Sequence, residues 1–347
     1  MLEKILMLNT LKNQHIINPL DDVNCIVRDA IGIQAQYLNN ALFAISIRHK
    51  NMHAKLDASV VRKIWSFRGT LHLHSVTDIN AIVSILRNDW YTRWGKYMSC
   101  FFSDDVRNRM KEQTCHFIEL GVCNRHLLRD ECVRLGYDIN IVNNVFSSWG
   151  GILKDLNYDG QIYFTEYDKA NFSLNNENLL DEKTCFSFGT ELAKRYFSFY
   201  GPATLSDFCH WVGISKSICE QWLLFVEKEL SYLMDEKKQK YYYIGKLNEN
   251  INELPTCVFL GGFDPLMLAY KNKSRWLKSE YQKNIFLKNG FVRNIILLDG
   301  MADAIWKLDK GVLKITLFEP TSKKKDIISN FIESSNVLAC KSVVYSN

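Results

Sequence analysis

Two glutamines one residue apart, Gln34 and Gln36, stand between apolar neighbours in the stretch IGIQAQYLNN, residues 31–40. Uncharged amides orient and hydrogen-bond other groups rather than acting as strong acids. On a continuous helix, residues two apart point in widely different directions, whereas on an extended segment they share a face. Gly32 favours a local break in the backbone here. From spacing alone, we favour the plainer interpretation of one surface glutamine and one hydrogen-bonded cap.

A second polar row lies in RGTLHLH, residues 68–74. A strand there would place Arg68, Thr70, His72 and His74 on one face and leucines on the other. His-x-His could supply two metal ligands, but no third ligand follows at a telling spacing, so we expect no metal. A row that contacts phosphate or supports an active site is the favoured interpretation. A solvent-facing strand is the alternative.

The best basic segment is YKNKSRWLKSEYQK, residues 270–283, which offers Lys271, Lys273 and Arg275 between aromatic residues. Cations interleaved with aromatic rings suit phosphates and stacked bases. A solvated surface face with one buried aromatic side explains the same pattern equally well.

The composition is that of an ordinary globular protein and leaves several functions open. The chain has 347 residues, 47% of them hydrophobic and 23% charged, and a net charge of +5, which permits a polyanionic partner without demanding one. No apolar run approaches the ~18 residues of a membrane span, and the N-terminus lacks a signal-peptide pattern. Ten cysteines without a Cys-x-x-Cys pair are typical of a reduced compartment. We therefore expect a cytoplasmic protein.

The order of expected elements predicts an α+β fold with tandem winged-helix (helix-turn-helix) motifs and a C-terminal β-rich domain. Helices at 103–121, 124–136 and 140–157 precede a hairpin at 159–174, and the same order returns at 187–245. A degenerate copy is expected near the N-terminus, although its residues 58–67 favour a helix. The predicted domains are 1–98 with the Gln-x-Gln motif, 99–183, 184–250 and 251–347. The last of these ends in a helix at 323–339 and is expected to be partly barrel-like. Its hairpin turns are expected at Asp299-Gly300 and Asp309-Lys310-Gly311, and Asn124 and Thr204 are expected to cap the helices that they precede.

Four blocks in order resemble the AlkZ-type family of bacterial winged-helix DNA glycosylases, which is related to YcaQ. The blocks are IGIQAQ, VVRKIWSFRGTLHLHSVTDI, LAKRYFSFYGPATLSDFCHWVGIS and FLGGFDPLMLAYKNKSRWL. The YcaQ branch has Gln-apolar-Asp where this chain has Gln34-Ala35-Gln36, so the chain resembles the Gln-apolar-Gln branch. Tyr37-Leu38, directly after the motif, departs from the expected continuation.

The resemblance implies a metal-independent, cofactor-free monomer, associated with the nucleoid, that binds double-stranded DNA containing alkylated or crosslinked purines. Gln34 and Gln36 would be the catalytic pair. A purine alkylated at N7 or N3 already carries positive charge and leaves without protonation, so orienting a water and stabilising the sugar cation suffice. Asp264, in the fourth block, could be a carboxylate near the site or a turn-forming residue before Pro265.

Two other functions stay open from the sequence. A non-catalytic winged-helix DNA-binding protein, such as a regulator, would share the fold and the basic surface but not the chemistry. A metal hydrolase built on His72 and His74 would contain bound metal.

Overall fold

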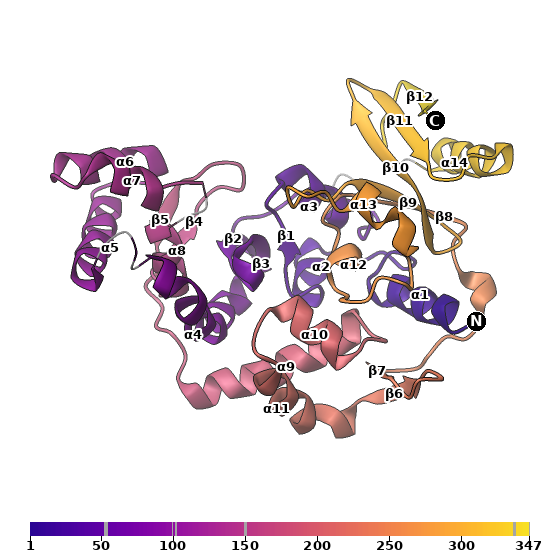
Figure 1. Ribbon diagram of the computed structural model, residues 1–347, viewed down its shortest axis with the longest axis horizontal. Helices are drawn as coiled ribbons and strands as arrows, with labels where there is room; N and C mark the ends of the chain where they lie inside the picture. The colour runs from indigo at the N-terminus through magenta and orange to yellow at the C-terminus, as the bar shows by residue number, and fades with distance from the viewer. Residues whose placement is uncertain (52–54, 99, 101–102, 149–150, 336–337, 347) are drawn as a thin grey trace.

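The structure is a computed structural model that describes residues 1–51, 55–98, 100, 103–148, 151–335 and 338–346. It has a mixed α+β architecture with a β-rich C-terminal region, as the sequence predicts. In Figure 1 a small sheet, β1–β3, lies in the middle of the molecule, with α9–α11 below it and the C-terminal strands to one side. None of the described helices is long and apolar enough to cross a bilayer.

The N-terminal part contains the helices α1 (Leu2–Asn13), α2 (Val23–Asp29), α3 (Leu38–Ser46) and α4 (Ile79–Met98) and the strands β1 (Ile33–Gln34), β2 (Val61–Trp65) and β3 (Leu71–Ser75). The strands form a sheet in the order β1-β3-β2, with both pairs antiparallel. The helix expected at 58–67 is wrong, because this segment forms β2. Its β-branched and aromatic residues suit a pleated, buried surface, and the pairing with β3 decides the outcome.

The next part contains α5 (Asp104–Glu119), α6 (Arg125–Arg134), α7 (Ile139–Val145), α8 (Gly151–Tyr158) and the hairpin strands β4 (Ile162–Phe164) and β5 (Phe172–Leu174). The side chain of Asn124 caps α6 by accepting a hydrogen bond from the His126 N–H, as expected. The helix expected at 140–157 is two helices instead. Trp149 and Gly150, inside that expected helix, lie outside the described residues.

The third part repeats helices followed by a hairpin: α9 (Glu182–Phe199), α10 (Leu205–Val212), α11 (Lys216–Val226), β6 (Ser231–Met234) and β7 (Lys240–Tyr243). Thr204 begins α10 with a capping box that includes Asp207. Gly213 ends α10 in the left-handed conformation. One apolar core runs from α2 through α11 and β7, so these parts pack together as one body.

The C-terminal sheet has the order β12-β11-β10-β9-β8. Its strands are β8 (Cys257–Leu260), β9 (Asn294–Leu298), β10 (Met301–Asp309), β11 (Val312–Leu317) and β12 (Ser342–Ser346). The turns expected at Asp299-Gly300 and Lys310-Gly311 are confirmed, and all four residues have positive φ. The sheet is open among the described strands, so the barrel-like expectation is wrong.

Short helices complete the fold: η1 (Phe67–Gly69), η2 (Val76–Asp78), η3 (Glu227–Glu229), η4 (Ile251–Glu253), η5 (Ser279–Tyr281), α12 (Pro265–Leu268) and α13 (Gln282–Ile285). The expected last helix is α14 (Ser322–Ser334), and residues 336–337 of the expected span lie outside the described part.

Candidate functional site

Gln34 and Gln36 lie on extended backbone, not on a helix. Gln34 is the last residue of β1 and pairs with His72 of β3, and the Ala35 N–H donates to the Leu71 carbonyl at 2.7 Å. Ile33 and Ala35 are buried, at 0% and 3% exposure. Because side chains alternate along an extended segment, the two glutamines share the opposite face. Neither amide makes a hydrogen bond to another residue in the described part of the chain.

The glutamines differ in exposure. Gln34 is only 9% exposed, whereas Gln36 is exposed at the end of the extended segment. Tyr37 follows and stacks on Phe263, with ring centroids 5.2 Å apart, and also contacts Phe291. Tyr37, which departs from the family pattern, therefore packs against the loop after β8. The plainer interpretation is therefore half right: Gln36 is a surface residue, but neither glutamine caps a helix, because α3 begins after Tyr37 without a side-chain cap.

The backbone at position 32 requires a glycine. Its φ is 110°, which side-chain-bearing residues rarely adopt, and a Cβ built on it would lie 2.3 Å from Cε1 of His74. The sharp turn after α2 therefore brings the glutamine segment directly against the histidine strand. This close approach is the structural reason for the break that the sequence suggests at Gly32.

His72 and His74 are bridged by the hydroxyl of Ser66. Oγ of Ser66 lies 2.9 Å from Nδ1 of His72 and 2.8 Å from Nε2 of His74. Nδ1 of His72 also lies 3.1 Å from the Thr70 carbonyl, which can only accept, so this nitrogen carries a proton. The Ser66 oxygen then accepts from Nδ1–H of His72, and the Ser66 hydroxyl donates its own proton to Nε2 of His74. This order leaves Nε2 of His72 as an unprotonated acceptor, on the sheet face that carries Gln34.

Both histidines are neutral at pH 7. Burial, the neighbouring His74 and the Arg68 guanidinium hold the pKa of His72 well below its ordinary value. Burial, with a smaller contribution from Arg195, lowers the pKa of His74 to about 3. His72 and His74 are 4% and 1% exposed. The expectation of a shared polar row is correct for these two residues, but the solvent-facing alternative is wrong.

Arg68 is not part of the strand. It lies with Gly69 in the tight turn between β2 and β3, where both residues have positive φ, an uncommon conformation for arginine. Its guanidinium donates to the Trp211 carbonyl. Burial lowers the pKa of Arg68 to about 10, so the side chain stays charged at pH 7. Thr70 is partly exposed and donates from its hydroxyl to the Phe67 carbonyl.

Arg68 belongs to a group of basic side chains drawn from three segments, which we call the basic cluster: Arg68, His210, Lys271 and Lys273. The pKa of His210 is lowered by burial and by its proximity to Lys273, Arg68 and Lys271. Burial also lowers the pKa of Lys273, with Arg68 contributing. The nearby Asp207 accepts hydrogen bonds from Thr204 and the Lys271 N–H, and its negative charge acts on His210 and Lys273. One carboxylate beside Arg68, Lys271 and Lys273 still leaves the cluster with excess positive charge.

The sequence missed His210, whose context FCHWVG reads as helix core. It lies on α10, far in sequence from the other members of the basic cluster. Only the packing of α10 against the β2–β3 turn brings it there. No local pattern signals this proximity.

The basic segment is corrected in part. Lys271 is exposed and Lys273 is partly buried, with Nζ 2.9 Å from the Tyr270 carbonyl. Arg275 is 4% exposed and donates to the Pro202 carbonyl, with Asp207 at 3.8 Å and the Tyr270 ring at 3.9 Å. Arg275 is therefore an internal cation and not an exposed phosphate contact. Tyr270 and Trp276 are fully buried, so they offer no stacking surface.

Asp264 is also corrected. It is fully buried, and both carboxylate oxygens accept hydrogen bonds from the Arg48 guanidinium at 2.8 Å. It also begins α12 by accepting from the Leu266 N–H, so the turn-forming alternative is right. Arg48 follows directly after α3, the helix that comes after the glutamines. Asp264 thus fixes α3 to the loop after β8 and is not a free carboxylate.

The described residues contain no cluster of three or more His, Cys, Asp or Glu side chains arranged to hold a metal ion. His72 and His74 are instead joined to each other through Ser66. Their arrangement gives no support to a metal hydrolase.

Comparison with known proteins points to one class. The family described as DNA glycosylase AlkZ-like matches residues 180–340. The solved structure of the DNA glycosylase AlkZ from Streptomyces sahachiroi is similar over 99% of both chains, with a TM-score of 0.78 and 19% identity. The whole chain therefore has the AlkZ fold.

A curated relative agrees with the structural match. The chain is 24% identical over 320 residues, covering 86% of this chain and 85% of the relative, to an interstrand DNA cross-link repair glycosylase from Streptomyces sahachiroi. The AlkZ-type resemblance seen in the sequence is confirmed, and the enzyme class that it implied, a DNA glycosylase, is supported by the family match and the curated relative.

Proposed function

We propose that this protein hydrolyses the N-glycosidic bond of cationic N-alkylated purines in double-stranded DNA and unhooks interstrand crosslinks. One observation carries the proposal: Gln34 and Gln36 share one face of extended backbone, with their amides unused by the rest of the described protein. A pair of amides held close to neutral histidines is suited to orienting a water molecule. Repair of a crosslink is what the name of the curated relative states for that protein.

The chemistry needs no strong acid. A purine alkylated at N7 or N3 leaves as a neutral base, so the enzyme must position water and stabilise the developing positive charge on the sugar. The amide oxygens of Gln34 and Gln36 accept hydrogen bonds from that water and present partial negative charge to the sugar. A neutral base would leave far more slowly, which gives selectivity for cationic lesions.

His72 would assist by orientation. Its Nε2 is left as an acceptor by the Ser66 and His74 hydrogen bonds, on the face that Gln34 shares. Because its pKa is held well below the ordinary value, His72 is a weak base and stays neutral. Its role in the proposal is to align the water or the glutamine amide, and not to remove a proton.

The basic cluster would contact the DNA backbone. Arg68, Lys271 and Lys273 carry positive charge that no free carboxylate in the described part of the chain balances, which suits phosphates. We further propose that the helix and hairpin units in 99–183 and 184–250, and the degenerate unit in 1–98, are winged-helix motifs around a monomeric DNA channel, with 251–347 as the β-rich domain. Their element order supports this.

The test is release of 7-methylguanine from a duplex under single-turnover conditions. Gln34→Ala and Gln36→Ala should each slow release by about 100-fold or more, the loss typical of one removed orienting group. Gln282→Ala removes an exposed glutamine on α13 and should leave the rate unchanged. Binding of the same duplex should change little in all three variants, because the amides act on the reaction and not on the phosphates.

Undiminished release in the Gln34→Ala, Gln36→Ala double variant would refute the mechanism. Tight DNA binding without release from any alkylated or crosslinked duplex would favour the alternative of a non-catalytic DNA-binding protein. Release from methylated but not crosslinked DNA would restrict the function to simple alkylation damage.

A further inference from the structure

Tyr37 directly follows Gln36, yet the proposed mechanism gives it no role. The residue is 48% exposed, which is high for an aromatic side chain that packs on other rings. Consecutive Cα atoms are only about 3.8 Å apart, so the Tyr37 ring and the amide of Gln36 are neighbours on the protein surface. A ligand held at the glutamines is therefore within reach of this ring.

Two phenylalanines hold the Tyr37 ring from one side. Phe263 stacks on it with ring centroids 5.2 Å apart, and Phe291 meets it at an angle of 81° with centroids 5.3 Å apart. The centroids of Phe263 and Phe291 are 5.7 Å apart. Because these three distances form a nearly equilateral triangle, Phe291 lies beside Phe263 and not across the Tyr37 ring from it. The opposite face of Tyr37 is covered by neither phenylalanine, in agreement with its exposure.

The support beneath Tyr37 is held firmly. Phe263 has a φ of 63°, a backbone conformation that bulky residues seldom adopt and that concentrates at functional sites. Asp264, the next residue, is fully buried and accepts two hydrogen bonds from the Arg48 guanidinium. These contacts fix the loop that presents Phe263. The Tyr37 ring therefore loses little freedom when a ligand stacks on it, which favours binding.

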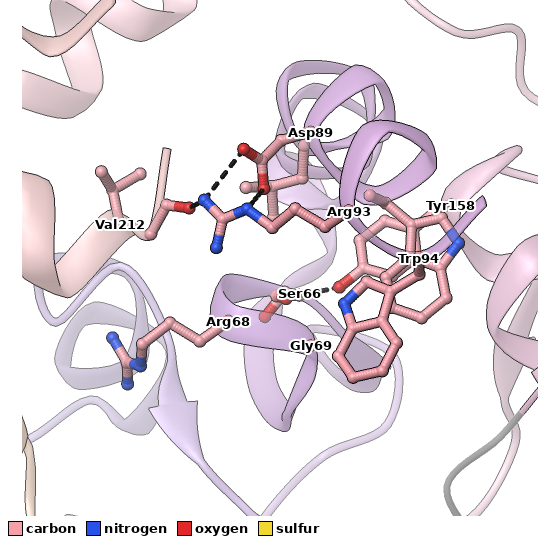
Figure 2. Close-up of a pocket in the computed structure, with 11 residues that line it drawn as sticks. Ser66, Arg68, Gly69, Asp89, Arg93, Trp94, Tyr158 and Val212 are labelled. Atoms are coloured by element: carbon pink, nitrogen blue, oxygen red, sulfur yellow. Dashed lines mark hydrogen bonds and ion pairs between the residues drawn. The ribbon is translucent and has the colours of Figure 1, made fainter. Parts of the chain in front are cut away.

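The glutamine segment has two borders of different chemistry. β1 pairs with β3, so one border is the turn that precedes β3. Arg68 of this turn belongs to the basic cluster, and Figure 2 shows its guanidinium pointing away from Trp94 and Tyr158. β1 is at the edge of its sheet, and beyond its end Tyr37 packs on the loop after β8. The first border suits phosphates, and the second suits a flat apolar group.

The substituent of an alkylated purine is the flat group that can reach Tyr37. N7 faces the major groove and N3 the minor groove, so a substituent on either atom projects from the stack while the base stays in it. A crosslinked purine is tethered to the other strand and is not free to rotate out, so its base cannot itself lie on a protein ring. Gln34 and Gln36 act at the sugar of the same nucleotide, which brings the substituent close to residue 37.

We propose that Tyr37 is a specificity-determining residue, whose open face stacks on an aromatic ring in the substituent of the alkylated purine. The inference rests on the proposed function, since Gln34 and Gln36 must act on the nucleotide that bears the substituent. The preferred substrates are then N7- or N3-alkylated purines with an aromatic substituent, and not methylated purines. Because the stack is the same before and during bond cleavage, it strengthens substrate binding and leaves the maximal rate unchanged.

The test uses the full-length protein and two duplexes of one sequence, with a single N7-benzylguanine or a single N7-methylguanine. Both bases are cationic, so the duplexes differ only in the substituent. Base release is measured under single-turnover conditions over a range of protein concentrations, and each rate is divided by that of uncatalysed depurination. Wild type should have the higher kcat/KM for the benzyl adduct. Tyr37→Ala should lower the benzyl-to-methyl ratio of kcat/KM by roughly 5- to 50-fold, through KM, the range for one aromatic stacking contact.

Two further variants show whether the ring itself is responsible. Tyr37→Phe keeps the ring and should keep the ratio, because the Tyr37 hydroxyl has no hydrogen-bond partner in the described part of the chain. Tyr232→Ala is the matched control, since Tyr232 is 47% exposed and also contacts another ring, that of Tyr242, but lies on β6. It should leave the ratio unchanged. A loss of folded protein slows both reactions equally, so the ratio is informative even for a destabilised variant.

An unchanged ratio in Tyr37→Ala would overturn the proposal, as would a wild type without preference for the benzyl adduct. Equal slowing of both reactions would place the ring against a part of the DNA that both duplexes share, and would overturn it as well. Binding of the two duplexes to the Gln34→Ala, Gln36→Ala variant separates this inference from the proposed function. There, adding Tyr37→Ala should abolish the preference for the benzyl duplex. Absence of base release by wild type would refute the proposed function, whereas this binding comparison decides for or against Tyr37.

Discussion

Acid should weaken this fold through His74. The residue is 1% exposed, and its pKa is about 3 in the folded protein, against about 6.5 for an ordinary histidine. Between these two values the unfolded chain binds a proton that the folded chain does not. Stability is therefore fully present above about pH 6.5 and falls as the pH decreases towards 3.

The magnitude follows from the two pKa values. A folded pKa of about 3 and an unfolded pKa of about 6.5 give a loss of about 2 kcal/mol on lowering the pH from 7.5 to 5. Protonation also removes the acceptor that Nε2 of His74 offers to the Ser66 hydroxyl, because both ring nitrogens then carry protons. His72 has its pKa shifted in the same direction and adds to the effect.

The assay is urea unfolding at pH 7.5 and at pH 5, with wild type compared to His74→Phe. The phenylalanine keeps a ring at this position but does not titrate, so it should be less stable at pH 7.5 and should lose about 2 kcal/mol less than wild type on acidification. His126→Ala is the control, since this histidine is exposed at the start of α6. Its pH response should match wild type.

The comparison isolates one side chain, because all other acid-sensitive groups are present in both proteins. Equal losses in wild type and His74→Phe would refute the assignment of a buried, neutral His74. A larger loss in His74→Phe would contradict that assignment as well.

Four further substitutions test the remaining assignments. Arg275→Ala should lower the free energy of unfolding by about 3 kcal/mol and leave the salt dependence of DNA binding unchanged. Lys271→Ala should instead reduce the slope of that salt dependence by about 1 without destabilising the fold. A reduced slope in Arg275→Ala would contradict its internal position. Gly32→Ala should cost about 2–4 kcal/mol by thermal or urea unfolding, because of its φ and its contact with the His74 ring; a neutral effect would show that the turn rearranges. Asp264→Asn should cost about 3 kcal/mol by leaving Arg48 buried without its anion, and the base-release rate of the folded fraction should persist; a lost rate at full stability would return Asp264 to the reaction.

Local signals in the sequence were reliable where one residue decides the backbone. Asn124 and Thr204 cap helices as expected, and the Asp299-Gly300 turn joins β9 to β10. Each of these positions is fixed by a side-chain hydrogen bond or by positive φ, which depend on the residue and its nearest neighbours. Such features require no knowledge of distant segments.

Expectations failed where a distant segment decides the outcome. Residues 61–65 carry apolar spacing that fits a helix, yet pairing with β3 makes them a strand. Arg275 looks like a surface cation in its local sequence, but Pro202 and Asp207 bury it. His210 shows the reverse case, since a residue with no local signal joins the basic cluster through the packing of α10.

The short turn between β2 and β3 is where the separate parts of the proposed site meet. Ser66 at its start holds both histidines and so fixes the strand beside Gln34. Arg68, two residues further on, contributes its charge to the basic cluster. Positive φ at Arg68 and Gly69 is a backbone cost that packing must offset, and such strain concentrates at functional sites. Because the roles of both Ser66 and Arg68 depend on this one turn, a change in its conformation would affect phosphate contact and water orientation together.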